Sequence, residues 1–118
     1  MYRGDGHTLL IPRATFARSW RARLVGLLAH RSLPDDEAMI LPACDSIHTI
    51  GMRFPIDAVF IDAAWRVVRV TSALPPGRFI LPVRGAWGVV ELAAGQAEVL
   101  ALRVGDQLRL VPSSMVGR

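Results

Sequence analysis

The side chains of this sequence that are best suited to chemistry gather in one short stretch. Between residues 44 and 62 the sequence holds Cys44, Asp45, His48, Arg53, Asp57 and Asp62. If residues 44–48 are extended, strand alternation places Cys44, Ser46 and His48 on one face. A histidine beside a cysteine lowers the pKa of a thiol and favours a thiolate nucleophile, and Asp57 from the next strand would orient the ring. The spacing therefore allows a catalytic set of Cys44, His48 and Asp57.

The same residues also allow two other interpretations. Cys44 can be a small buried hydrophobe, His48 a hydrogen-bonded histidine and Asp57 a turn or cap residue that accepts backbone N–H groups. Alternatively, Cys44, His48 and Asp57 supply three ligands for zinc, with one position left open. No second Cys or His follows closely enough to complete a structural site, and no hydrolase or oxidoreductase motif is present. We therefore expect no metal and no cofactor, and we favour a noncatalytic role over an enzyme.

Two carboxylates stand in strongly apolar surroundings. Asp57 follows Pro-Ile, and Glu91 follows Val-Val. A buried carboxylate must be paired or hydrogen-bonded, and Arg53 and Arg84 are available partners. These carboxylates and arginines suit either of two roles. They can form an Arg–carboxylate bridge between strands, or they can form a recognition site. We expect a small polar pocket whose ligand-binding residues are His48, Arg53, Asp57 and Glu91.

The elements that would position these groups are mostly strands. A helical spacing over residues 15–28 places Phe16, Trp20, Leu24, Leu27 and Leu28 on one face, with Thr15 as the N-cap. β-branched and aromatic runs predict strands at 9–12, 38–42, 66–71, 87–92 and 107–111, with two more between 46 and 62. Residues 62–65 form a hairpin connection, residues 74–82 a long loop that is a natural place for function, and residues 96–102 a short helix.

These elements predict an α+β fold that is mainly antiparallel β. We expect a curled sheet or small barrel-like β domain with one N-terminal helix and one short helix near the C-terminus. The chain has 118 residues, of which 52% are hydrophobic and 20% charged. This length and composition suit one domain over residues 1–118 that folds alone.

The charge suggests an acidic partner as an alternative role. All 14 basic residues are arginine and the net charge is +4. No Asp or Glu occurs between His7 and Pro34, where the sequence holds Arg13, Arg18, Arg21, Arg23 and Arg31. An arginine-rich helix there would suit anionic lipid, nucleic acid or an acidic protein face, although it would equally be a solvated helix face. No clear nucleic-acid motif accompanies it.

Cysteine usage and hydropathy predict a cytoplasmic location. Cys44 is the one cysteine, so no internal disulfide requires an oxidising compartment. The apolar run at residues 9–11 ends at Pro12, which is shorter than a signal-peptide core. No uninterrupted apolar run approaches the ~20 residues that span a bilayer. We expect a soluble cytoplasmic protein without a transmembrane segment.

Four blocks, in order and spacing, resemble a known family. They are LVGLL at 24–28 with Arg31, SIHT at 46–49 with GM at 51–52, IDAVFID at 56–62, and ELAAG at 91–95 with VGD at 104–106. Together they resemble the bacterial and archaeal family called domain of unknown function 192, over residues 13–110. The family's more familiar central pattern has an aromatic residue followed by Met-Lys-Asn-Thr, which this chain replaces with residues 47–53. The resemblance implies a compact β-rich fold and supplies no established activity or cofactor.

The residues and the resemblance together favour a noncatalytic binding or accessory module with a small polar pocket. Its partner would be a small ligand or a protein. The alternatives are a Cys44/His48 enzyme, with or without metal, and an interaction module that uses the arginine-rich helix. The sequence does not give the oligomeric state.

Overall fold

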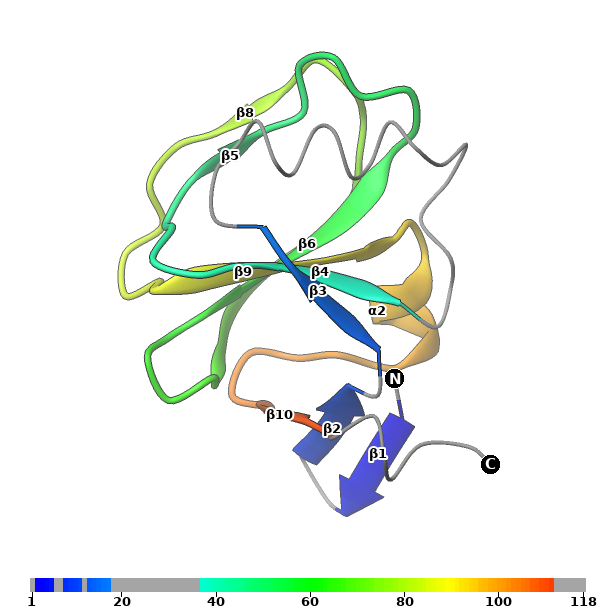
Figure 1. Ribbon diagram of the computed structural model, residues 1–118, viewed down its shortest axis with the longest axis vertical. Coiled ribbons are helices and arrows are strands. Elements are labelled where there is room, and N and C mark those ends of the chain that lie inside the picture. Colours follow the sequence, from blue (N-terminus) through cyan, green and yellow to red (C-terminus); the bar gives the residue numbers. More distant parts are fainter. Residues whose placement is uncertain (1, 6–7, 12, 18–36, 112–118) are drawn as a thin grey trace.

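Three sheets build the part of the chain that the structure describes. The structure is a computed structural model, and it describes residues 2–5, 8–11, 13–17 and 37–111. The central sheet has five strands in the order β3-β4-β9-β6-β7. Their bounds are β3 Ala14–Phe16, β4 Ala38–Leu41, β9 Gly88–Ala93, β6 Ile56–Ile61 and β7 Val67–Leu74. In Figure 1 these strands occupy the middle of the molecule.

The two smaller sheets lie toward opposite ends of the long axis (Figure 1). One contains β1 Tyr2–Asp5, β2 Thr8–Ile11 and β10 Gln107–Leu110, in the order β1-β2-β10. The other is a ribbon of β5 Ile47–His48 paired with β8 Phe79–Ile80. The short helix α2 Gln96–Val99 follows β9.

Strands β6 and β9 are buried on both faces because a separate apolar cluster covers each side. Every residue of both strands is buried. Alternation sends Ala58 and Phe60 of β6 into a first core, and Val59 and Ile61 into a second core on the other face. Full burial of a side chain such as Phe60 contributes roughly 1.5–3 kcal/mol to folding. The two cores hold the central sheet as a rigid platform.

Much of the predicted β structure is confirmed. The strands expected at 9–12, 38–42, 66–71, 87–92 and 107–111 correspond to β2, β4, β7, β9 and β10, and the expected pair between 46 and 62 is β5 and β6. The 62–65 hairpin connection forms because Asp62 Oδ1 accepts hydrogen bonds from the amides of Ala64 and Arg66, both at 2.9 Å. The short helix near the C-terminus is α2.

The sheet arrangement corrects the barrel-like alternative and refines the mainly antiparallel prediction, which holds for most of the pairs. The described strands do not close into a barrel, because they form three separate hydrogen-bonded sheets. Pairing is also mixed: β3–β4 and β2–β10 are parallel, while the other strand pairs are antiparallel. The local residue pattern could not reveal either point, because strand direction depends on how distant segments meet.

The predicted N-terminal helix is not supported. Thr15, the expected N-cap, and Phe16 lie in β3, where Thr15 pairs with Met39 of β4. The remainder of that prediction, including residues 18–28, lies outside the described residues. Parallel pairing with β4 therefore overrides the local helical spacing where the predicted helix was to begin.

Candidate functional site

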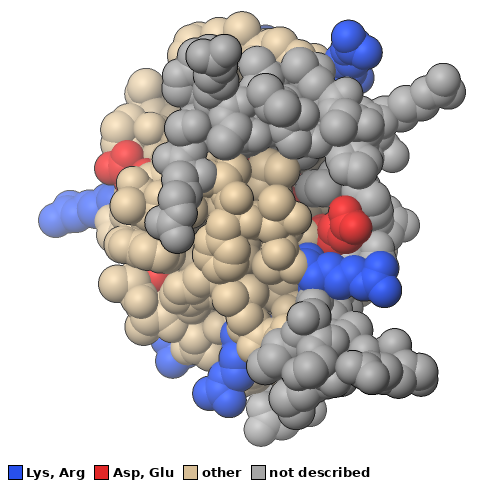
Figure 2. Space-filling view, viewed as in Figure 1, with Lys and Arg blue, Asp and Glu red and all other residues tan. Residues whose placement is uncertain are grey.

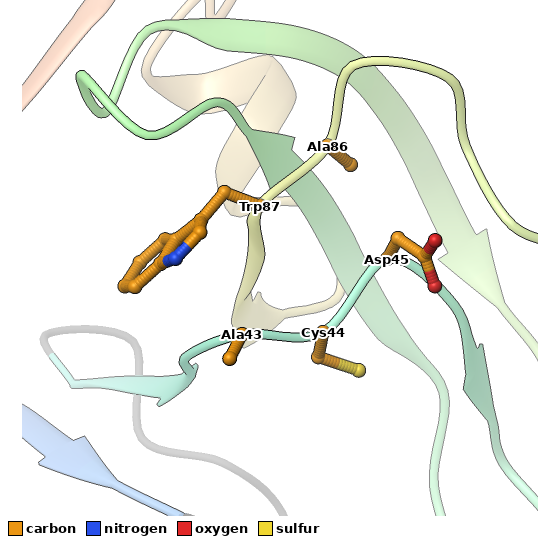
Figure 3. A pocket seen from close by; sticks show the side chains of 5 residues that line it. All are labelled: Ala43, Cys44, Asp45, Ala86 and Trp87. Atoms are coloured by element: carbon orange, nitrogen blue, oxygen red, sulfur yellow. The ribbon is translucent and has the colours of Figure 1, made fainter.

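A hollow lies where two loops approach each other beside the central sheet. It has a volume of about 270 Å³ and is lined by Ala43, Cys44, Asp45, Ala86 and Trp87. Figure 3 shows that these residues come from two chain segments far apart in the sequence. The first segment joins β4 to β5 and the second joins β8 to β9. The hollow is therefore made by tertiary contact.

Backbone hydrogen bonds fix the two loops. The amide of Cys44 donates to the carbonyl of Trp87 at 2.7 Å, and the amide of Trp87 donates to the carbonyl of Ile61 in β6 at 2.7 Å. The amide of Val83 donates to the carbonyl of Asp45 at 2.8 Å. This chain of bonds connects both walls of the hollow to the sheet, so a ligand would meet a preformed surface.

The lining combines a carboxylate, a thiol and an indole with small side chains that leave space. Figure 3 shows the Trp87 ring and the Asp45 carboxylate extending to opposite sides, with Cys44 between them. Asp45 is exposed and Cys44 is half-buried. Ala43 has a φ of 52°, in the left-handed region that is unfavourable for residues other than glycine. Ala43 therefore lines the hollow with an uncommon backbone conformation.

Cys44 and His48 do not form the predicted nucleophilic pair. The Cys44 thiol donates to the carbonyl of Ser46 at 2.8 Å. The His48 ring lies 6.0 Å from the Phe79 ring, between centroids. Strand β5 includes only Ile47 and His48 of this stretch, so Cys44 lies outside the strand that was assumed to place it beside His48. The thiol points to a carbonyl acceptor, which does not activate it.

The Asp57 carboxylate accepts hydrogen bonds from three backbone amides. The side chain is 0% exposed. Its Oδ1 accepts from the amide of Ala73 at 2.7 Å, and its Oδ2 accepts from the amides of Gly95 and Ala97 at 3.1 and 2.8 Å. The carboxylate thus joins β6 to the end of β7 and to the start of α2. This arrangement confirms the alternative in which Asp57 accepts backbone N–H groups.

Glu91 lies on the other face of the sheet. It pairs with Met39 of β4 and Ala58 of β6, which belong to the first core. Asp57 pairs with Leu92, which belongs to the second core. Neighbouring residues along a strand point to opposite faces, so the two buried carboxylates point away from each other. The structure does not bring His48, Arg53, Asp57 and Glu91 into one pocket.

The other predicted groups are also separated. Arg53 is exposed in the turn between β5 and β6. Within the described residues, no three His, Cys, Asp or Glu side chains are placed to hold a metal ion. Cys44, His48 and Asp57 therefore do not form the alternative zinc set. None of the described helices is long and apolar enough to cross a bilayer.

Thr49 has a structural role that the sequence did not reveal. The side chain is 0% exposed. Its hydroxyl donates to the carbonyl of Pro75 at 2.6 Å and accepts from the amide of Arg78 at 2.8 Å. Its own amide donates to the carbonyl of Arg78 at 2.8 Å. The only signal was a small polar residue beside apolar ones. Thr49 fastens the turn after β5 to the loop before β8.

We expect Thr49→Val to lower the free energy of unfolding by about 1.5 kcal/mol, because two backbone groups lose their partner while the volume stays the same. Urea denaturation measures this loss. Thr71→Val is the matched control, since the Thr71 hydroxyl is buried without a hydrogen bond, and its removal should be neutral or stabilising. Equal losses from both substitutions would contradict the role given to Thr49.

The described part of the chain thus combines a β-rich fold with a surface hollow, and within it Cys44 and His48 do not form a catalytic pair. A family model described as "Uncharacterized ACR", domain of unknown function 192, matches residues 3–110. The chain belongs to this family, as its four sequence blocks predicted. The function of the family is uncharacterised.

Individual relatives agree with this assignment. A UPF0127 protein of Pyrococcus furiosus is 41% identical over 63 residues, covering 53% of this chain and 53% of that protein. A UPF0127 protein of Thermococcus sibiricus is 30% identical over 100 residues, covering 81% of this chain and 64% of that protein. The matches thus span about half to two thirds of the relatives' length.

A solved structure shows a similar fold. A Novosphingobium aromaticivorans protein of unknown function aligns with a TM-score of 0.68 and 25% identity, over 80% of this chain and 71% of that protein.

Proposed function

We propose that this chain is a noncatalytic binding module that holds a small polar ligand in the hollow between residues 43–45 and 86–87. The observation that carries the proposal is the preformed lining, in which Asp45, Cys44 and Trp87 lie on loops that hydrogen bonds fix to the sheet. Binding sites typically place a few polar groups on a rigid and largely preformed surface.

The size of the hollow sets the size of the ligand. Its volume of about 270 Å³ lies just below the range of roughly 300–1,000 Å³ that is usual for small-molecule pockets. The ligand would be smaller than a nucleotide. The exposed Asp45 carboxylate favours a ligand that donates hydrogen bonds, and Trp87, on the other side of Cys44, offers an apolar surface.

This proposal moves the ligand away from the residues predicted for it. Asp57 uses both carboxylate oxygens on backbone amides, and Glu91 faces the first core. The Cys44 thiol donates to the carbonyl of Ser46, an acceptor that does not activate it, and this geometry favours binding over thiol chemistry. The arginine-rich segment of the alternative proposal lies outside the described residues, apart from Arg13.

A screen of small polar molecules by NMR tests the proposal. We expect a binding molecule to shift the amide resonances of Cys44, Asp45, Ala86 and Trp87 in the labelled protein. Ala86→Leu should fill the hollow and weaken binding at least about tenfold, since a bulky side chain then competes for the ligand's volume. Asp45→Asn should weaken binding of hydrogen-bond donors without unfolding the chain, because Asp45 is exposed.

Ala63→Leu is the matched control for Ala86→Leu, because Ala63 is exposed in the β6–β7 turn, away from the lining. It should leave the affinity unchanged. Ligand shifts that map elsewhere, or an affinity that Ala86→Leu leaves intact, would refute the proposed site.

A further inference from the structure

The β5–β8 ribbon has one face in the core and one face in solvent. Ile47 pairs with Ile80, and both pack on the first core. His48 pairs with Phe79, and alternation places both on the other face of the ribbon, where Phe79 is exposed and His48 is half-buried. Leu81, the residue after β8, is 79% exposed. The ribbon therefore presents its outer face near one end of the molecule (Figure 1).

That outer face is unusually apolar for an exposed surface. Phe79 is 68% exposed, and Ile50 in the turn after β5 is 47% exposed. With Leu81 they form what we call the apolar rim: Ile50, Phe79 and Leu81. Scattered apolar residues on a surface need no explanation, but three large ones on adjoining segments point to an interaction site.

The charges beside the apolar rim are mostly positive; the exposed Asp45, whose carbonyl accepts from the amide of Val83, is an exception. Residues 46–56 and 72–84, which form the ribbon and its flanking turns, contain Arg53, Arg78 and Arg84 and no Asp or Glu. All three arginines are exposed. In the view of Figure 2, arginine side chains project at separate points of the molecule's edge, some of them close to carboxylates. The surroundings of the apolar rim would therefore attract an anionic surface.

Hydrogen bonds within the chain fix the conformation of the segments that carry the apolar rim. The Thr49 hydroxyl bonds to the carbonyl of Pro75 and the amide of Arg78. The amide of Gly77 donates to the carbonyl of Thr49 at 2.9 Å. These bonds connect the Ile50 turn to the segment that carries Phe79. Insertion of the rim into a partner would then require little ordering of the chain.

We infer that the apolar rim docks on the surface of a bilayer that contains anionic lipid, with the three arginines at the level of the headgroups. Apolar side chains enter the boundary of the acyl chains, and basic side chains beside them bind anionic headgroups. Three projecting side chains suit this shallow insertion, whereas a stable protein interface buries about 800 Å² on each partner. The apolar rim shares no residue with the lining of the hollow.

Vesicle co-sedimentation of the full chain tests the inference. We expect the protein to pellet with vesicles that contain phosphatidylglycerol, and to stay in solution with phosphatidylcholine alone. Phe79→Ser with Leu81→Ser should lower the partition coefficient at least about tenfold, because both insertion anchors are lost. Arg78→Gln should lower it about fivefold at low salt.

Val99→Ser with Val104→Ser is the matched control. These valines are 74% and 68% exposed and lie outside the rim, so their replacement should not change binding. An equal loss in the control pair, or vesicle binding that survives Phe79→Ser with Leu81→Ser, would overturn the inference. So would a wild-type chain that stays in solution with anionic vesicles, which would leave an acidic protein face as the occupant of the rim.

Discussion

Replacing Asp57 with alanine should lower the free energy of unfolding by about 4 kcal/mol, the largest effect of any single substitution considered for this chain. The carboxylate is fully buried and accepts from the amides of Ala73, Gly95 and Ala97. Alanine would leave these backbone donors without their acceptor. The loss would loosen the start of α2 and its connection to β6 and β7.

Urea denaturation of three chains measures this effect. Asp57→Asn should cost less than Asp57→Ala, because the amide oxygen still accepts while the amide nitrogen opposes a backbone donor. Asp45→Asn, an exposed carboxylate, should change the free energy of unfolding by no more than about 0.5 kcal/mol. If Asp57→Ala were as mild as Asp45→Asn, the assignment of Asp57 to the fold would be wrong.

The second large effect is expected at Gly88, the first residue of β9. A Cβ atom there would lie 2.9 Å from the carbonyl oxygen of Leu41 and 3.7 Å from the Cα of Pro42. Both atoms belong to the backbone at the end of β4, so they cannot rotate away. We expect Gly88→Ala to lower the free energy of unfolding by about 3 kcal/mol through overpacking.

Gly85→Ala separates this steric effect from backbone strain. A Cβ at Gly85 meets nothing within 4 Å, but the φ of +84° is unfavourable for alanine. Its cost should be about 1 kcal/mol. Gly88→Ala should in addition shift the amide resonances of Ala43 and Cys44, because the end of β4 leads into the hollow. A Gly88→Ala chain as stable as wild type would show that β4 and β9 approach less closely than described.

The fold could be predicted from sequence wherever a local pattern determined the structure. The β-branched run at 56–61 predicted β6, and Asp62 predicted the turn that its side chain stabilises. Strand β8 was missed because Phe79 and Ile80 are too few for a pattern, and they lie in a stretch rich in Pro and Gly. The helix predicted to begin at Thr15 does not begin there, because residues 14–16 pair with β4 as a strand, and this pairing outweighs the helical spacing.

The candidate site could be predicted only in part, because its geometry depends on strand register. Asp57 and Glu91 both looked like buried polar groups, and both are 0% exposed. Their opposite faces follow from the pairing of Ala58 with Glu91, which no local pattern contains. The hollow joins Cys44 to Trp87 across the fold. Cys44 was a candidate from its reactivity, while Trp87 was assigned only to a strand.

Native mass spectrometry of the untagged chain with a ligand from the NMR screen tests the binding hollow most directly. Wild-type chain and Ala86→Leu chain would be purified without chelators and measured side by side. The account predicts one stoichiometric adduct on the wild-type chain and its loss from the Ala86→Leu chain, with the Ala63→Leu chain like wild type. Adducts of equal intensity on the wild-type and Ala86→Leu chains would place the ligand outside the hollow and contradict the account.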